Sequence, residues 1–314
     1  MSFVNGSESN GSVALQRQGV LGLVLFGTVT TLPCCVFLFI NLTMLVTLRS
    51  KAVFRDTSRY ALLFGLLCAD TVQLAHSQSM FLLSTLRVTL PYPVCAALTV
   101  LNHLTLSVSL ITLVLMCLER YVAVCFPFRH GAFITAKTTG VAICMVWCFS
   151  AIKDITQLSL ILSFHFQNVK QVQMLDFCGR ESVFVDAVSE TFNRAFTYFL
   201  LVLGGLTVSF SYAGIIVAAR SASTDAASAG RARRTLLLHL LQMGLTLSST
   251  VHNALLIVIS TRLDRVVALR VQVVLYVCVI ILPKCLSSLI YGLRDRTIRP
   301  VLLLNLTCQW RRPF

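Results

Sequence analysis

Residues 95–121 read CAALTVLNHLTLSVSLITLVLMCLERY, and this segment decides the fold of the chain. It begins with Cys95 and contains no Asp, Glu, Lys or Arg before Glu119 and Arg120. As an α-helix it separates Cys95 from Arg120 by roughly 37 Å, at about 1.5 Å per residue. That length is close to the thickness of a bilayer with its headgroup regions. The segment is therefore predicted to be a membrane-spanning helix.

The composition of the whole chain agrees with a membrane location. Of the 314 residues, 56% are hydrophobic and only 12% are charged, whereas a soluble domain carries about a quarter charged residues. The net charge of +14 comes from basic residues scattered among apolar segments. This scatter argues against a nucleic-acid-binding surface, so we expect the lipid bilayer, and no nucleic acid, as a partner.

Six further apolar segments of spanning length flank residues 95–121. The seven predicted spans are residues 20–48, 60–84, 94–119, 138–163, 195–219, 235–260 and 267–293. Backbone groups in lipid must find their hydrogen bonds within the segment, so each span is predicted to be helical. The expected fold class is an all-α, seven-transmembrane helix bundle.

The distribution of basic residues predicts the orientation of this bundle. Most of the 26 Lys and Arg residues lie in segments that face the cytoplasm if the amino terminus is outside the cell. The sequence therefore predicts an extracellular tail at 1–19, a seven-transmembrane domain at 20–293 and a cytoplasmic tail at 294–314 with a short amphipathic helix. The expected location is the plasma membrane.

Two glycosylation motifs agree with this orientation. Asn5-Gly6-Ser7 and Asn10-Gly11-Ser12 lie in the predicted outer tail, so Asn5 and Asn10 are candidate acceptors. The motif at Asn41 lies within a span and that at Asn305 lies inside the cell. Both of these are expected to stay unmodified.

The chain has 12 cysteines, and the topology sorts them. Only Cys95 and Cys178 lie outside the membrane on the outer, oxidising side, so they are the disulfide candidates. Cys308 follows the last span on the inner side and is a candidate for palmitoylation. Most of the others lie within spans or at their inner ends and are interpreted as small, polarizable core residues.

The inner end of the third span carries the most informative motif. Residues 116–129, MCLERYVAVCFPFR, resemble the corresponding segment of rhodopsin-like G-protein-coupled receptors, and of odorant receptors most closely, particularly the fish-type ones. The resemblance covers essentially the whole chain. Other matching positions are Asn41, Leu66 to Asp70, Trp147, Ser211-Tyr212, Arg231 to Arg234, His239, and Pro283 to Arg294.

This resemblance implies a chemosensory receptor that binds a small organic, odorant-like ligand in the outer half of the bundle and activates a heterotrimeric G protein. The chain departs from the family at several points. Ser287-Ser288 stands where the family has an Asn-Pro pair, and the usual prolines of the fifth and sixth helices are missing. The kink of the seventh helix is then expected to come from Pro283 or to be weaker.

By the same resemblance, the inner end of the third span is an activation switch. Glu119 is expected to hold Arg120 through a charge-assisted hydrogen bond at rest. Tyr121 completes the motif, and Tyr212 and Tyr291 would approach Arg120 in the open state. The alternative is that Arg120 is an ordinary positive-inside anchor and that the tyrosines pack at the membrane interface.

A buried ionisable residue in a span is a functional hypothesis by default, and Asp70 is one. The resemblance gives Asp70 the neighbours Asn41, Ser109 and the turn from Lys284 to Ser287. In many relatives this cluster binds sodium. We expect Lys284 to pair with Asp70 and to replace the ion, while the alternative is that Lys284 snorkels or faces a water pocket.

The ligand pocket is expected in the outer half of the bundle, between the third, fifth, sixth and seventh helices. The candidate contacts are Asn102, His103, Leu106, Ser107, Val251, His252 and Tyr276. His103 reads either as a contact for a polar odorant or as a hydrogen-bonded core histidine. Lys153-Asp154, unusual within a span, would pair internally or face the pocket.

Other classes of protein fit less well. A transporter or channel would show repeats, broken half-helices or a run of pore-lining polar residues, and none is convincing here. No nucleophile has a matched base, so an enzyme is not expected. No Gly-rich phosphate loop or zinc-type cluster is present, so no cofactor or metal is predicted. A non-olfactory rhodopsin-like receptor remains the alternative within the same class.

Overall fold

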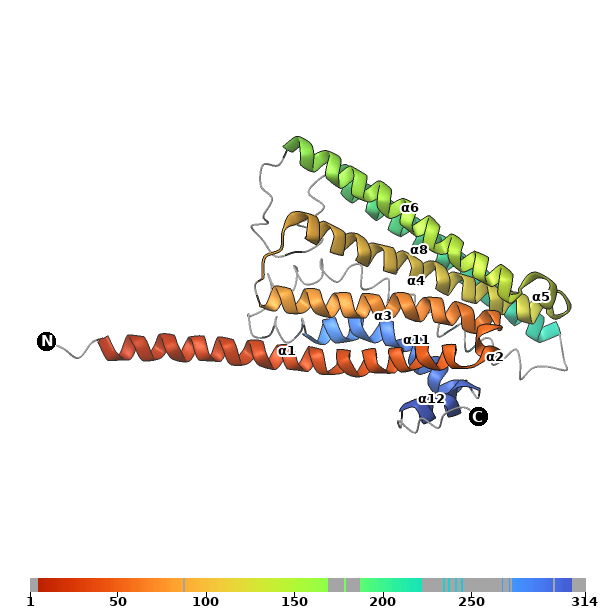
Figure 1. Cartoon of the computed structure of the whole chain (residues 1–314), viewed down its shortest axis with the longest axis horizontal. Helices are drawn as coiled ribbons and strands as arrows, with labels where there is room; N and C mark the ends of the chain where they lie inside the picture. Colours follow the sequence, from red (N-terminus) through yellow and green to blue (C-terminus); the bar gives the residue numbers. More distant parts are fainter. Residues whose placement is uncertain are drawn as a thin grey trace.

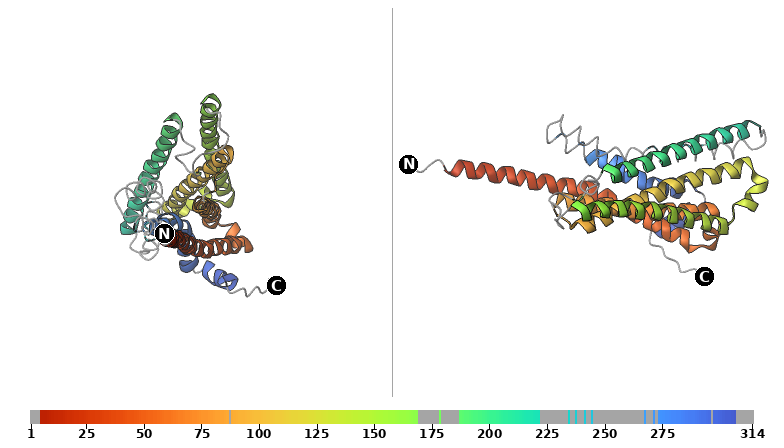
Figure 2. Two further views of the ribbon diagram at one scale, coloured as in Figure 1. Left: turned by 90° about the vertical axis from the view of Figure 1, so that its left-hand side faces the viewer. Right: turned by 90° about the horizontal axis from the view of Figure 1, so that it is seen from above.

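A computed structural model shows an all-helical protein (Figures 1 and 2). It describes residues 5–86, 88–168, 178, 187–221, 273–295 and 297–306, with isolated positions between 234 and 271. The five long helices are α1 (Asn5–Ser50), α3 (Ser58–Thr85), α4 (Tyr92–Cys125), α6 (Ala136–Asn168) and α8 (Ala187–Ser221). The shorter elements are α2 (Ala52–Arg55), α5 (Pro127–Phe133), the π-helix η1 (Tyr276–Ile281), α11 (Leu282–Arg294) and α12 (Ile298–Leu306).

The first five predicted spans each coincide with one long helix, and each helix is longer than its span. The largest difference is in α1, which begins at Asn5 instead of residue 20 and projects beyond the other helices (Figure 1). The helix therefore continues into the predicted tail, while its apolar segment of spanning length is Gly27–Ser50. The sixth span lies outside the described residues except for isolated positions.

Four described helices are long and apolar enough to cross a bilayer. Their apolar segments are Gly27–Ser50, Tyr92–Cys125, Ala136–Leu162 and Ala187–Ala218. The 28-residue helix α3 has the length but is more polar, because it carries buried Gln73, Gln78 and Asp70. These side chains face neighbouring helices, so α3 can lie in a membrane protein without exposing them to lipid.

The helices pack around α4. This helix contacts α3, α6 and α8, while α1 and α11 pack against α3 on the other side. The long helices lie roughly side by side, as the view along the bundle shows (Figure 2). Since α4 is the 95–121 segment extended at both ends, the segment that decides the fold also occupies its centre.

The polarity of the bundle is inverted relative to a soluble protein. Asn41, Asp70, Lys153, Asp154 and Lys284 are all buried, whereas large apolar side chains cover the outer surface. On α1 the exposed apolar residues recur every three or four positions: Val29, Leu32, Val36, Phe39, Leu42 and Val46. This spacing makes one continuous helix face, which is suited to contact with lipid.

The free cysteines follow the same inverted pattern, and this corrects their interpretation as core residues. Cys34, Cys117 and Cys285 are buried, but Cys35, Cys144, Cys148 and Cys278 are exposed. A thiol behaves as a small apolar group. It can therefore face hydrocarbon lipid as well as the protein core.

The seventh predicted span, described from residue 273 onward, contains a π-helical turn directly before Pro283. Leu282 N donates to Val277 O, five residues back, in place of the usual four. A proline has no N–H and its ring clashes with the carbonyl four residues earlier, and one wider turn relieves both problems. The irregularity expected at Pro283 therefore takes the form of η1.

A short helix, α12, follows the last span within the tail for which the sequence predicted one. Asp295 organises its start by accepting hydrogen bonds from Thr297 N at 2.9 Å and Ile298 N at 3.4 Å. The same carboxylate forms an ion pair with Arg59 at 3.2 Å and accepts from Tyr60 Oη. One residue thus ties α12 to the beginning of α3.

Candidate functional site

A disulfide closes one end of the bundle. It joins Cys95, in the first turn of α4, to Cys178, with 5.6 Å between the two Cα atoms. Around it Tyr92 and Ala96 pack against Ile161 of α6, with Cys178 against the same cluster. We call this the disulfide end, and the two cysteines are the pair that the topology predicted.

The opposite end of α4 carries Glu119 and Arg120, and we call it the arginine end. Glu119 Oε2 lies 2.9 Å from Arg120 Nε, and the glutamate side chain is only 6% exposed. The other carboxylate oxygen lies 3.5 Å from His130 Nε2 of α5. The sequence did not point to His130. His130 lies ten residues after Arg120 in the short helix α5. Only the fold of α5 back onto α4 brings its side chain to Glu119.

Tyr121 packs into the interface between α4 and α8. A Cβ atom built on Gly214 of α8 would overlap the ring of Tyr121, so a larger residue at 214 requires the ring to shift. Tyr212 is partly buried in the same apolar cluster as Tyr121. The side chain of Tyr291 lies outside the described residues. Of the predicted switch residues, the structure thus brings Glu119 to Arg120 and places Tyr121 beside Tyr212.

At mid-height the bundle contains a buried ion pair. Asp70 Oδ1 accepts a hydrogen bond from Ser109 Oγ at 2.8 Å and lies 3.8 Å from Lys284 Nζ. The side chains of Asp70 and Lys284 are 1% and 4% exposed. Within the described part of the chain, Asp70 Oδ2 has no hydrogen-bond partner. The two charges are therefore close enough to compensate each other, although 3.8 Å is longer than a hydrogen bond.

Asn41 connects α1 to this centre. Its Nδ2 donates to the backbone oxygen of Lys284 at 3.1 Å, and its Oδ1 accepts from Ser288 Oγ at 2.5 Å. The network therefore uses Ser288, whereas the sequence named Ser287, whose side chain is not described. Helical periodicity could have found this, because residues four apart share one helix face and Ser288 is four positions after Lys284.

The predicted ligand contacts on α4 are largely buried. His103, Leu106 and Ser107 are each less than 10% exposed, and Leu106 packs against α8 in an apolar cluster. Asn102 Oδ1 accepts from Gln73 Nε2 of α3 at 3.5 Å. These side chains therefore lie between helices. Such a position fits either a ligand pocket or a packed core.

The candidate ligand contact on the seventh helix, Tyr276, packs against α3. Tyr276 stacks on Phe81 of α3, with ring centroids 4.7 Å apart, and its hydroxyl donates to Gln78 Oε1 at 3.4 Å. Tyr276 thus packs η1 against α3, and its role as a ligand contact stays a prediction. Val251 and His252 lie outside the described residues.

A small apolar groove lies between α4 and α8. It is lined by Leu110, Ile111, Val114, Leu200, Leu203 and Gly204. Leu110 is one helical turn beyond Leu106 toward the arginine end. None of the described ligand candidates, Asn102, His103, Leu106, Ser107 and Tyr276, lines this groove.

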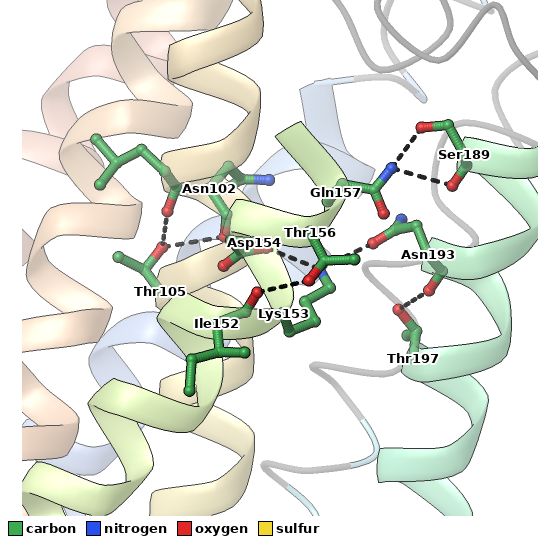
Figure 3. A network of polar contacts seen from close by, with 11 residues as sticks. Asn102, Thr105, Ile152, Lys153, Asp154, Thr156, Gln157, Ser189, Asn193 and Thr197 are labelled. Atoms are coloured by element: carbon green, nitrogen blue, oxygen red, sulfur yellow. Dashed lines mark hydrogen bonds and ion pairs between the residues drawn. The ribbon is translucent and has the colours of Figure 1, made fainter. Parts of the chain in front are cut away.

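A second buried polar network joins α6 to α8 (Figure 3). Lys153 Nζ donates to Asp154 Oδ1 at 2.8 Å and to Asn193 Oδ1 at 3.2 Å. Gln157 Nε2 donates to the backbone oxygen and the hydroxyl of Ser189. Of the two possibilities that the sequence left open for Lys153 and Asp154, internal pairing is therefore realised.

Comparison with known proteins agrees with this architecture. Residues 40–306 match the model of the 7 transmembrane receptor (rhodopsin family). The chain is 29% identical to odorant receptor 131-2 of Danio rerio over 83% of its own length and 79% of that protein. It is 26% identical to human olfactory receptor 4K15 over 68% of its length and 64% of that receptor.

A receptor for a different stimulus is also similar. The chain is 23% identical to muscarinic acetylcholine receptor M5 of Rattus norvegicus, over 67% of its own length but only 38% of that protein. The family match covers every described element from the second half of α1 to α12, and its members are receptors instead of enzymes. The chain therefore belongs to the rhodopsin family of seven-transmembrane receptors.

Proposed function

We propose that the protein is an odorant receptor of the plasma membrane that binds a small organic ligand near the disulfide end and activates a heterotrimeric G protein at the arginine end. The observation that carries this proposal is the similarity to odorant receptor 131-2, which extends over most of both chains. The disulfide end faces outward in this proposal, in agreement with the oxidising environment that a disulfide needs.

The Glu119–Arg120 pair supplies the switch. The buried carboxylate holds the guanidinium by a charge-assisted hydrogen bond, and His130 of α5 shares the same carboxylate. An agonist that binds the open bundle more tightly shifts the equilibrium toward the state in which Arg120 is released. The released arginine, with Tyr121, Tyr212 and Tyr291 around it, then receives the G protein.

The Asp70–Lys284 pair serves the resting core in this proposal. Lys284 carries the positive charge that sodium provides in many relatives, so no bound cation is needed. Asn41, Ser109 and Ser288 complete the polar centre. The α1 segment that precedes the bundle lies outside the cell and carries glycans on Asn5 and Asn10.

A non-olfactory receptor is the second candidate. The similarity to the muscarinic receptor supports it, because that receptor responds to a stimulus other than an odorant. The two candidates share the fold, the switch and the orientation. They differ in the ligand and in the cell that expresses the protein.

A reporter assay tests the proposed function. The full-length chain is expressed with a G protein and a cAMP reporter, and a broad odorant panel is applied. We expect at least one odorant to raise the signal, and we expect Arg120→Ala to abolish it. The control Arg55→Ala removes an exposed arginine near the same end and should leave the response unchanged. A silent receptor at the cell surface would contradict the olfactory assignment, and an unchanged response in Arg120→Ala would contradict the switch.

A further inference from the structure

The polar network between α6 and α8 contains a buried ion pair together with buried amide and hydroxyl groups (Figure 3). Its members, the Lys153 cluster, are Ser150, Lys153, Asp154 and Gln157 of α6 with Ser189 and Asn193 of α8. All six residues are at most 6% exposed. An ion pair in the apolar part of a membrane protein is costly and marks a functional site by default.

Several atoms of the Lys153 cluster are buried without a hydrogen-bond partner among the described residues. They are Asp154 Oδ2, Gln157 Oε1, Asn193 Nδ2 and Ser150 Oγ. Each unsatisfied buried group costs free energy, and four in one cluster is a large penalty for a purely structural network. Such a group of buried atoms has the hydrogen-bonding capacity to receive a polar ligand.

The orphaned atoms offer both kinds of hydrogen-bonding capacity. Asp154 Oδ2 is an anionic acceptor and Gln157 Oε1 a neutral one, whereas Asn193 Nδ2 is a donor. Lys153 uses two of its three N–H groups on Asp154 and Asn193 and has one more to donate. The cluster therefore complements a group that is cationic on one side and anionic on the other.

The depth of the cluster can be derived from α4 and α6, which run in opposite directions. Ile161 packs with Ala96 near the disulfide end, and Val146 packs with Val108 further down. Linear spacing between these two contacts puts the α6 members of the Lys153 cluster, from Gln157 to Ser150, level with residues 99–105 of α4. At 3.6 residues per turn, Gln157 lies about one helical turn from Ile161, Lys153 and Asp154 about two, and Ser150 about three.

The helix α8 leads to the same depth. It runs parallel to α4, with Gly214 against Tyr121 and Leu203 beside Leu110 in the apolar groove. In both contacts the α8 residue number exceeds the α4 residue number by 93. The same difference puts Asn193 level with residue 100 of α4. Helices α4, α6 and α8 thus bring polar side chains to one level of the bundle. The predicted ligand contacts of α4 lie at this same level.

We propose that the Lys153 cluster is a recognition site for a zwitterionic head group, an ammonium and a carboxylate on one carbon, as in an α-amino acid. This inference rests on the proposed function and names its ligand class. The ammonium binds Asp154 and Gln157, and the carboxylate binds Lys153 and Asn193. The cluster has one positive and one negative side chain, so a zwitterion leaves no net charge buried, whereas a simple amine or acid does.

Thermal unfolding of the purified full-length receptor tests this site without requiring a G protein. A thiol-reactive fluorophore reports unfolding, because Cys117 and Cys285 are buried in the native protein. The probes are the standard α-amino acids at millimolar concentration. Each amino acid that raises the midpoint of unfolding is compared with two analogues. One is the amine that lacks the carboxylate, and the other is the acid that lacks the ammonium group.

We expect at least one amino acid to raise the midpoint of unfolding, and the matched amine and acid to need at least about tenfold higher concentration, since each lacks charge-assisted hydrogen bonds. The proposal is overturned if no amino acid raises the midpoint. It is equally overturned if the amine or the acid acts at the same concentration as the amino acid, which would indicate a site for a single charge.

Two variants locate the binding site. Asp154→Asn is expected to weaken the effect of the amino acid at least about tenfold. The control Glu190→Gln likewise replaces a carboxylate by an amide, one helical turn from Asn193. The Glu190 carboxylate is partly exposed and paired with Arg194, so this variant should bind the amino acid normally. Unchanged binding in Asp154→Asn would overturn the proposal.

If Asp154→Asn fails to fold, the double variant Lys153→Met/Asp154→Leu replaces the whole ion pair by apolar groups, an exchange that buried pairs often tolerate. It should fold and lose the response to amino acids. The cAMP assay separates the two proposals. Amino-acid binding without signalling would refute the receptor function but not the site, and signalling by other odorants without amino-acid binding would refute the site alone.

Discussion

At the scale of single residues, the bundle is organised by a few buried charges. Asp70 and Lys284 come from α3 and α11, and Lys153 and Asp154 from α6. The sequence identified all four, because a charge within an apolar span is conspicuous. It did not identify the neutral partners Asn193, Gln157 and Ser288, since a lone amide or hydroxyl in a span is common and only contact reveals its use.

Lys284→Met should destabilise the protein by about 3–5 kcal/mol, because it leaves the Asp70 carboxylate buried without compensation. The double variant Asp70→Asn/Lys284→Met should recover most of this loss. Thermal unfolding of the purified receptor measures both. If the double variant lost as much stability as Asp70→Asn and Lys284→Met lose separately in sum, the two side chains would not be coupled. Sodium-dependent ligand binding in the wild type would also refute the pairing, because Lys284 is proposed to replace that ion.

Glu119→Gln should raise ligand-free signalling. The substitution removes the carboxylate that holds Arg120 at 2.9 Å, and loss of a charge-assisted hydrogen bond shifts an equilibrium by on the order of tenfold or more. The basal cAMP signal, normalised to surface expression, measures it. Asp56→Asn removes an exposed carboxylate near the same end and should have no effect. Basal activity equal to wild type in Glu119→Gln would show that Glu119 does not restrain the switch.

At the scale of elements, α4 and α8 approach closely because glycine permits it. The Cβ that Gly214 lacks would overlap the ring of Tyr121. The tight contact lies next to the arginine end. The interface between these two helices therefore couples the position of α8 to the motif that contains Arg120.

Gly214→Ala should destabilise the protein by roughly 1–3 kcal/mol, because the added methyl group overpacks the contact with Tyr121. Gly205→Ala on the same helix is the matched control. A Cβ there meets nothing within 4 Å, and alanine in a helix stabilises by up to about 1 kcal/mol relative to glycine. Unfolding midpoints of the two variants should therefore move in opposite directions. A stabilised Gly214→Ala would show that Tyr121 moves aside freely.

At the scale of the whole molecule, the inverted polarity of the bundle decides where it lies. Buried charges and an exposed apolar surface suit a lipid environment. The basic residues near α2, α5 and α12, at the arginine end, set the expected direction of insertion. Only one direction of insertion presents Arg120 to a G protein.

An epitope placed before residue 5 should be accessible to antibody on intact cells, because the amino terminus is predicted to be outside. An epitope after residue 314 should be detected only after permeabilisation. Immunofluorescence of the two tagged chains makes the comparison. Detection of the amino-terminal tag only after permeabilisation would invert the topology and remove the basis of the proposed function.

The sequence alone determined the fold class, most helix positions and the disulfide pair. These follow from apolar length, the sidedness of Lys and Arg and the compartment of two cysteines, all of which are local properties of the chain. The same holds for the adjacent pair Glu119 and Arg120. Neighbours in sequence at a helix end need no knowledge of the rest of the bundle.

Tertiary structure alone decided which helix faces meet. It brought Ser288 to Asn41, Tyr276 to Phe81, His130 to Glu119 and Asn193 to Lys153. Each of these contacts depends on how the helices are rotated and packed, and those of Ser288 and Tyr276 also depend on the π-turn before Pro283, which shifts the register of the last span. Hydropathy is nearly blind to rotation in a chain that is apolar all round, so only the packed bundle specifies these contacts.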